Sequence, residues 1–243
     1  MHSDGFNKTE NINKFNYFAR VMRLIIFPIL FLIFMESPAQ IVVDKSKSIR
    51  FLALGDSYTI GESVSEDERW PELLAASLRT KGVQIEKPKI IATTGWRTDQ
   101  LKQAILSSGT TDDYDLVSLL IGVNNQYQKK SPESYEPEFR ELLEMAIKKA
   151  GGRKDKVFVV SIPDYGHTPF GQARQIEISE DLDEFNEVNK EITIESGIAY
   201  FNITEISREG LRDPELVATD RLHPSGKMYR LWVEEILKGF LVR

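Results

Sequence analysis

The stretch "LGDSYTIGE", residues 54–62, follows an apolar run and places Asp56 and Ser57 where a strand gives way to a helix. The preceding run, "SIRFLAL" at residues 48–54, is the nearly continuous apolar segment expected of a strand covered on both faces. Ligands of a parallel sheet bind just beyond the carboxyl ends of its strands. Ser57 is therefore either an ordinary helix cap or a side chain placed for chemistry, and the partners available elsewhere in the sequence decide between the two.

The same alternation of short apolar runs and longer helical stretches continues to the end of the chain. It predicts one α/β domain over residues 40–243, with a five-stranded parallel sheet covered by helices on both faces. The expected strands are residues 48–54, 89–94, 115–122, 156–162 and 198–203, and the expected helices are residues 70–80, 98–107, 135–150, 179–195 and 225–240.

The composition excludes several classes of protein. With 41% hydrophobic and 28% charged residues, the 243-residue chain is globular rather than disordered or fibrous. A formal net charge of −6 argues against nucleic acid as a partner, because binding to phosphates needs a basic face. The sequence contains no cysteine, which excludes disulfide bonds and thiolate chemistry.

Residues 1–39 have the features of a signal peptide. Basic residues precede the apolar run "LIIFPILFLIFM", residues 24–35, which is shorter than the roughly 20 residues of a membrane-spanning helix. Ser37 and Ala39 supply the small residues that a signal peptidase recognises. We therefore expect cleavage near Ala39 and export of the mature chain, periplasmic or secreted; an uncleaved membrane anchor is the alternative. The polar stretch before Met22 suggests that translation starts at Met22.

Two histidines are candidates for the base that a serine nucleophile needs, since a third, His2, lies in the expected leader. Asp220 precedes His223 by three residues, a spacing that can place the carboxylate and the ring on one side of a turn. His167 has only Asp164 as a nearby orienting group. We therefore expect His223 to be the base and Asp220 to orient it, with His167 at most lining the substrate.

Three N–H groups at strand ends are candidates for an oxyanion hole. Gly95, in a turn after the second strand, has no side chain to block its N–H, and Asn124, after the third strand, offers an amide. The backbone N–H of Ser57 lies at a helix start. A lone glycine or asparagine in such a place is usually only a turn residue, so the prediction depends on all these groups meeting on one rim.

Four short blocks occur in order along the chain: "GDSY" at residues 55–58, Gly95 in its turn, "GVNN" at residues 122–125 and "DRLHP" at residues 220–224. Together they resemble the sequence blocks of the GDSL, or SGNH, family of serine hydrolases. The resemblance implies a three-layer, flavodoxin-like α/β/α sandwich. The site residues that it implies are the catalytic Ser57, Asp220 and His223, and an oxyanion hole formed by Ser57, Gly95 and Asn124.

Two positions depart from the family pattern. Tyr58 stands where the family name has leucine, which changes the local packing and the pocket wall. Asn125 stands where the third block usually has aspartate, which removes a charge beside the oxyanion hole. Since neither is a triad or oxyanion position, we expect them to affect substrate preference rather than catalysis. The G-x-S-x-G signature of the α/β-hydrolase fold is absent from the sequence.

The loop "PDYGHTPFGQ", residues 163–172, is rich in proline, glycine and aromatic residues and follows the fourth strand, which predicts a shaped loop over the site. Its aromatic side chains could wall an acyl or sugar pocket, or simply cover the sheet edge. The candidate pocket residues are Tyr58, Trp96, Tyr127, Tyr165, His167 and Phe170.

The sequence thus predicts a serine esterase that cleaves a small-molecule carboxylic ester through an acyl-enzyme, without a cofactor or an obligatory protein partner. Asp220 and His223 could instead form a surface ion pair or ligate a metal, but the chain has too few histidines and no cysteine to complete a metal site. The substrate could be a lysophospholipid, a simple acyl ester, an acetylated sugar or a thioester. A catalytically silent binding module of the same fold is the alternative from another class.

Overall fold

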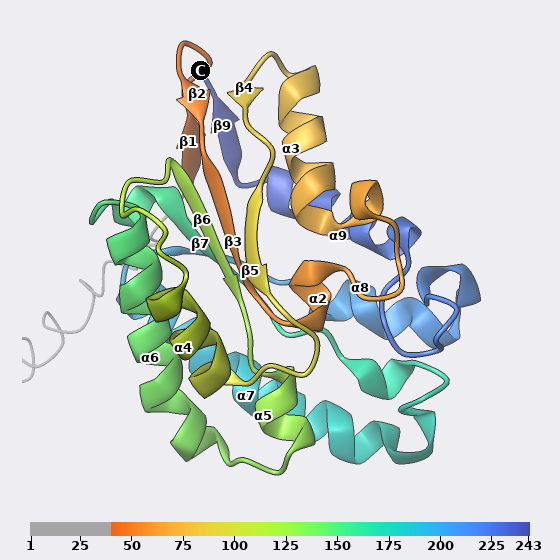
Figure 1. Ribbon diagram of the computed structural model, residues 1–243. Helices are drawn as coiled ribbons and strands as arrows, with labels where there is room; N and C mark the ends of the chain where they lie inside the picture. The colour runs from red at the N-terminus through yellow and green to blue at the C-terminus, as the bar shows by residue number, and fades with distance from the viewer. Residues whose placement is uncertain (1–39) are drawn as a thin grey trace, which may run out of the picture. The chain divides into compact units, whose positions relative to one another are not determined.

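The computed structural model describes residues 40–243, and the predicted signal peptide lies outside them. Five parallel strands form the central sheet in the order β5-β3-β6-β7-β8 (Figure 1). This confirms the predicted five-stranded parallel sheet. Its strands are β3 (Phe51–Gly55), β5 (Lys89–Ala92), β6 (Leu116–Leu120), β7 (Val157–Val160) and β8 (Ala199–Phe201).

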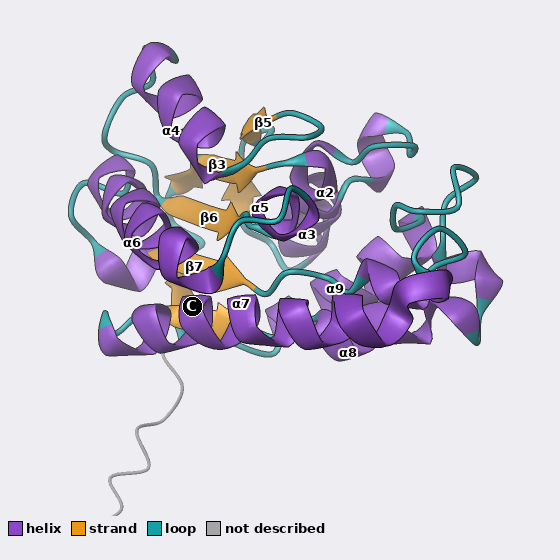
Figure 2. Ribbon diagram, turned by 90° about the horizontal axis from the view of Figure 1, so that it is seen from below, coloured by secondary structure: helices purple, strands orange, loops and turns teal. Residues whose placement is uncertain are grey.

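Helices cover both faces of this sheet, so the predicted three-layer sandwich is also confirmed. In Figure 2, α4 and α6 lie on one side of the strands and α3 and α9 on the other. The α-helices are α2 (Ser57–Ile60), α3 (Trp70–Thr80), α4 (Thr98–Ser107), α5 (Val123–Tyr127), α6 (Pro132–Lys149), α7 (Gln175–Glu195), α8 (Thr204–Ser207) and α9 (Gly226–Leu237). The 3-10 helices are η1 (Glu66–Glu68), η2 (Lys154–Lys156), η3 (Tyr165–His167), η4 (Gln172–Arg174), η5 (Arg208–Leu211) and η6 (Pro214–Leu216).

The core forms where the apolar strands meet the apolar stripes of these helices. Every residue of β3, β6 and β7 is buried, which explains why their sequences are apolar at every position except Ser118 rather than alternating. On one face, α3 and α9 contact each other and bury two tryptophans, Trp70 and Trp232. The sheet is thereby packed between helices, and its carboxyl edge carries the loops that follow the strands.

The predicted first strand is divided in the structure. Ser48–Ile49 (β2) pairs with Gln84–Ile85 (β4) in a separate two-stranded sheet, and β3 begins only at Phe51. Between them the Arg50 carbonyl accepts hydrogen bonds from the backbone N–H groups of Asp115 and Leu116. This local change of partners is a tertiary effect that the continuous apolar run does not reveal.

The two ends of the described chain meet in a short parallel pair that the sequence pattern does not predict. Ile41–Val43 (β1) pairs with Phe240–Val242 (β9), at the top of Figure 1. Ile41 and Val43 are buried there, and the Lys156 ammonium donates to the Val42 carbonyl over 2.7 Å. Three-residue strands of this kind depend on long-range pairing rather than on local pattern.

Helix boundaries follow ordinary capping chemistry. Ser131 caps α6 by accepting from the Ser134 N–H, and Pro132 takes the first helical position, so this helix starts earlier than the predicted residue 135. Ser225 likewise caps α9 through the Met228 N–H. Within residues 40–243, no helix is long and apolar enough to cross a membrane.

Candidate active site

The site begins at the turn from β3 into α2. Asp56 is the N-cap of α2, and its Oδ1 accepts a hydrogen bond from the Tyr58 backbone N–H over 3.0 Å. Ser57 is the first residue of the helix and is only 4% exposed. The capping role therefore belongs to Asp56, which leaves the Ser57 hydroxyl available for another purpose.

Asp56 is itself unusual because its carboxyl group is completely buried. Its Oδ2 has no hydrogen-bond partner among residues 40–243. Burial raises the pKa of Asp56 from 3.8 to about 7, although the backbone N–H of Tyr58 opposes the shift. A carboxyl group next to Ser57 is thus held close to the boundary between its neutral and ionised forms at neutral pH.

His223 and Asp220 lie together as the sequence predicted. The His223 Nδ1 atom is 2.6 Å from Asp220 Oδ2, while Asp220 Oδ1 accepts the backbone N–H groups of Leu222 and His223, each over 3.0 Å. Burial would raise the pKa of Asp220, but hydrogen bonds from Ser63, His223 and the two backbone groups outweigh it and lower the pKa to about 2. The carboxylate therefore stays ionised beside the ring.

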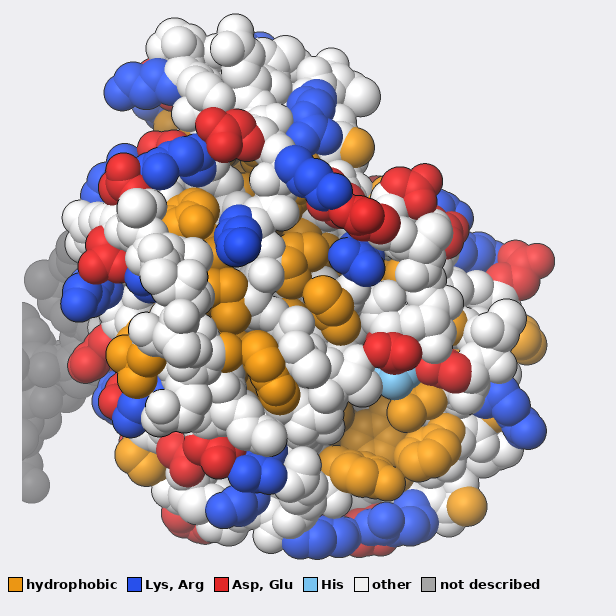
Figure 3. All heavy atoms as spheres, in the orientation of Figure 1, with side chains coloured by type: hydrophobic (Ala, Val, Ile, Leu, Met, Phe, Trp, Pro, Cys, Tyr) orange, Lys and Arg blue, Asp and Glu red, His pale blue; other side chains and the backbone are white. Residues whose placement is uncertain are grey.

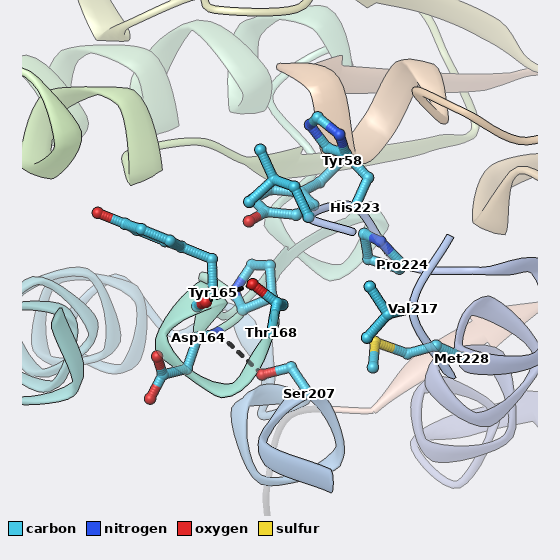
Figure 4. A pocket seen from close by; sticks show the side chains of 11 residues that line it. Tyr58, Asp164, Tyr165, Thr168, Ser207, Val217, His223, Pro224 and Met228 are labelled. Atoms are coloured by element: carbon cyan, nitrogen blue, oxygen red, sulfur yellow. Dashed lines mark hydrogen bonds between the residues drawn. The ribbon is translucent and has the colours of Figure 1, made fainter. Parts of the chain in front are cut away.

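His223 is largely buried, with 8% of its surface exposed. The Tyr58 ring meets it edge-on, with 5.7 Å between ring centroids. Behind it a small cavity of about 10 Å³ is lined by Val217, Pro224 and Met228 among others (Figure 4). The substitution of Tyr58 for the family leucine thus places an aromatic ring directly against the candidate base.

The two predicted oxyanion donors outside α2 also lie together. The Asn124 Nδ2 atom donates to the Trp96 carbonyl over 3.0 Å, which ties α5 to the turn after β5 and leaves a second amide hydrogen for a ligand. Gly95 in this turn has a φ of +86°, a conformation that favours glycine. The turn therefore presents its backbone without a side chain in the way.

A cavity of about 310 Å³ joins these groups, and Figure 3 shows a hollow lined by apolar side chains beside a histidine. No hydrogen bond links the Ser57 hydroxyl to His223 in the part of the chain that the structure describes, although both residues line this cavity. Asp220 lies behind His223, outside the lining. The cavity is lined by Ser57, Tyr58, Thr94, Gly95, Val123, Asn124, Tyr127, Tyr165, Phe170, Leu222 and His223.

Three of the predicted pocket aromatics form one wall of the cavity. Tyr165 lies 6.1 Å from Tyr127 and 6.3 Å from Phe170, measured between ring centroids. Tyr127 and Phe170 are 53% and 52% exposed, which is unusual for such large apolar rings. The Tyr165 hydroxyl donates to Gln126 Oε1 over 2.9 Å, and partial burial raises its pKa to about 12, so it stays protonated.

The remaining two predicted pocket residues do not line the cavity. Trp96 lies in a groove between β5 and α4 and reaches the site only through its carbonyl group. His167 hydrogen-bonds Gln175 and lies 3.8 Å from Asp164 Oδ2. The buried carboxylate of Asp164 accepts hydrogen bonds from Ser179 and Arg208, and neither Asp164 nor His167 is among the residues that line the cavity.

Residues that the sequence pattern did not single out complete the cavity. Thr94, Val123 and Leu222 lie directly beside predicted site residues in the same strand-end loops. Their position next to those residues in the sequence is the feature from which they can be predicted. Asn125, the second departure from the family pattern, is buried and receives the Thr98 backbone N–H on its side-chain oxygen over 3.1 Å. It therefore supports the loop rather than facing the cavity.

The fold is a three-layer α/β/α sandwich around a parallel sheet. The candidate site lies at the carboxyl ends of the strands. A model of the GDSL-like lipase/acylhydrolase family matches residues 53–231, most of the chain, and the protein therefore belongs to this family. No curated protein sequence matches the chain.

Solved structures share the fold at low sequence identity. A putative GDSL-like lipase from Parabacteroides merdae is 18% identical, with a TM-score of 0.66 over 82% of this chain and 98% of that one. TesA is 13% identical, with a TM-score of 0.62 over 79% and 97%. Axe2, an acetylxylan esterase from Geobacillus stearothermophilus, is 19% identical, with a TM-score of 0.59 over 79% and 93%.

Proposed function

We propose that the protein is a serine esterase that cleaves a carboxylic ester through an acyl-enzyme on Ser57. The observation that carries this proposal is the 2.6 Å contact between His223 Nδ1 and Asp220 Oδ2, at the edge of a cavity that Ser57 also lines. An ionised carboxylate on one nitrogen of the ring leaves Nε2 free to accept a proton. Ser57 and His223 line the same open cavity, so an ester bound there can reach both the hydroxyl and the ring.

In the first half of the reaction the Ser57 Oγ attacks the ester carbonyl carbon while its proton passes to His223 Nε2. The carbonyl oxygen becomes an oxyanion, which the backbone N–H groups of Ser57 and Gly95 and the Asn124 amide stabilise. The tetrahedral intermediate then expels the alcohol, which takes the proton from His223. The contact between Ser57 and His223 has to tighten on substrate binding, as is common for catalytic hydrogen bonds.

The second half returns the enzyme to its starting state. A water molecule gives a proton to His223 and attacks the acyl carbon, and the same three donors hold the second oxyanion. Collapse of that intermediate breaks the bond to Ser57 Oγ, which recovers its proton from His223. Throughout, Asp220 stays ionised and stabilises the charged ring.

The cavity favours an apolar acyl group. Its wall carries Tyr127, Tyr165 and Phe170, and a volume of about 310 Å³ lies at the lower end for a small-molecule site. We therefore infer a substrate with a short to medium acyl chain in preference to an acetylated sugar, although the structural relatives include an acetylxylan esterase. A lysophospholipid would leave its headgroup outside the cavity.

Comparison of the wild type with the Ser57→Ala variant on p-nitrophenyl esters of increasing acyl length tests the proposal. Loss of the nucleophile should lower kcat by about 10⁴ to 10⁶, with folding unchanged by circular dichroism. Comparable activity in the variant would refute the serine mechanism. A preference for acetate over longer acyl esters in the wild type would refute the assigned acyl pocket.

We also propose export of the mature chain after cleavage near Ala39, on the basis of the short apolar run at residues 24–35. Mass spectrometry of the protein recovered outside the cytoplasm should give a chain that begins at Gln40. An intact leader on membranes would support the alternative of an uncleaved anchor.

A further inference from the structure

A hydroxyl group outside the predicted triad reaches the orienting carboxylate. The Ser63 Oγ donates to Asp220 Oδ2 over 2.6 Å, across 157 positions of the sequence. The same Oδ2 atom is 2.6 Å from His223 Nδ1. Ser63 and His223 therefore bind the same oxygen atom of Asp220.

The hydrogen bonds of Asp220 are divided evenly between its two oxygens. Oδ1 accepts the backbone N–H groups of Leu222 and His223, which fix the side chain relative to its own loop. Oδ2 accepts from the ring of His223 and from Ser63. Ser63 is thus the group that ties this carboxylate to a segment of the chain other than its own.

The backbone around Ser63 is shaped to deliver this hydroxyl. Gly61 ends α2 in the left-handed conformation, and Ser63 follows with a φ of +65°. A left-handed φ is uncommon for a residue with a side chain, and such strain persists where the surrounding structure requires it. The turn after the nucleophile helix thereby brings Ser63, a few residues beyond Ser57, against the loop that carries Asp220.

We propose that Ser63 is a positioning residue that holds Asp220 Oδ2 in its bond to His223 and couples the nucleophile turn to the loop of the base. This role rests on the proposed serine esterase function. Ser63 does not line the cavity, so it acts through Asp220 and not on the substrate. Because Ser63 is exposed and the Asp220 side chain is 30% exposed, water competes for the same oxygen when the hydroxyl is removed.

Two variants separate the hydroxyl from the backbone turn. Ser63→Ala removes the hydroxyl at a strained φ, whereas Ser63→Gly removes it at a φ that glycine adopts readily. Both should lower kcat about five- to twenty-fold with KM within about two-fold of the wild type, and slow labelling of Ser57 by a fluorophosphonate by the same factor. Ser65→Ala is a matched control, since the Ser65 hydroxyl binds Glu68 instead and its loss should leave kcat unchanged.

The Asp220→Ala background shows whether Ser63 acts through the carboxylate. There the added Ser63→Ala change should have no further effect on the residual rate of labelling. An equal loss in that background, full activity in both Ser63 variants, or full activity in Ser63→Gly alone would overturn the proposal. A Ser57→Ala protein that still turns over ester would instead refute the proposed function, whatever the Ser63 variants do.

Discussion

Nδ1 of His223 lies 2.6 Å from Oδ2 of Asp220, three residues earlier in the same loop. The Val217–Pro224 bridge closes this loop, and the Ala218 N–H donates to the His223 carbonyl over 2.8 Å. Arg221, between the two residues, has a φ of +68°. The Asp–His contact is therefore built into a short, constrained segment rather than assembled from two distant parts of the chain.

Replacement of Asp220 by asparagine should lower kcat by about 10² to 10⁴ while the fold is retained. The amide oxygen of the new side chain can still accept the Leu222 and His223 N–H groups, but the negative charge beside the ring is lost. Steady-state kinetics on a p-nitrophenyl ester measures the effect, with thermal unfolding as the control. Retention of more than about a tenth of the wild-type kcat would contradict the assigned role of Asp220.

Replacement of Asn124 by alanine should lower kcat by about 10² to 10³, because one oxyanion donor is removed. The KM should change little, since the amide binds the oxyanion more strongly than the substrate carbonyl. Asn124→Asp, which cannot donate from its side chain when ionised, should be at least as impaired; recovery of activity in that variant would exclude Asn124 as a donor.

Asp56 should make stability depend on pH in the direction opposite to an ordinary acidic residue. Its folded-state pKa of about 7 lies above the usual 3.8. The contribution of Asp56 to folding stability is therefore fully present below pH 3.8 and is lost as the pH rises through 7. Asp56→Asn keeps the acceptor for the Tyr58 N–H but has no proton to lose. The free energy of unfolding of the variant, relative to that of the wild type, should therefore rise by about 2 to 3 kcal/mol from about pH 5 to pH 8.

Denaturant unfolding of both proteins at several pH values measures this difference. Titration of the other groups occurs in both proteins and cancels in the comparison. A difference between variant and wild type that does not change with pH would show that Asp56 ionises normally in the folded chain.

The exposed aromatic rings of the cavity wall should determine the acyl preference. Phe170→Ala should lower kcat/KM for a medium-chain ester about ten-fold, because an aromatic contact with the acyl chain is worth about 1 kcal/mol or slightly more. Hydrolysis of the acetate ester should change less than about two-fold. Leu106→Ala, which replaces a 64% exposed side chain on α4, is the control; an equal loss on both esters in Phe170→Ala would assign the ring to structure instead.

Much of the fold follows from local pattern. The helices at residues 70–80 and 98–107 are predicted with the bounds that the structure gives, because their apolar periodicity and first-turn residues are local signals. The β1–β9 pair and the break at Arg50 are not predicted. Both depend on hydrogen bonds to residues far away in the sequence, which no window of the chain contains.

In the site, too, features set by local sequence are predicted and those set by long-range contacts are not. The spacing of Asp220 and His223 is local, and the structure brings the two side chains together. The position of His167 does not follow from its neighbours in the sequence, because Asp164 forms a buried ion pair with Arg208, 44 positions away. The contact between Ser63 and Asp220 is likewise not predicted, since nothing in the sequence around Ser63 indicates it.

A fluorophosphonate probe on the purified protein tests whether Ser57 is an activated nucleophile. Peptide mapping by mass spectrometry then identifies the modified residue. We expect one phosphonyl group per chain, on Ser57, and none after Ser57→Ala or after heat denaturation. A folded wild-type protein that stays unlabelled, or one labelled at another residue, would contradict it.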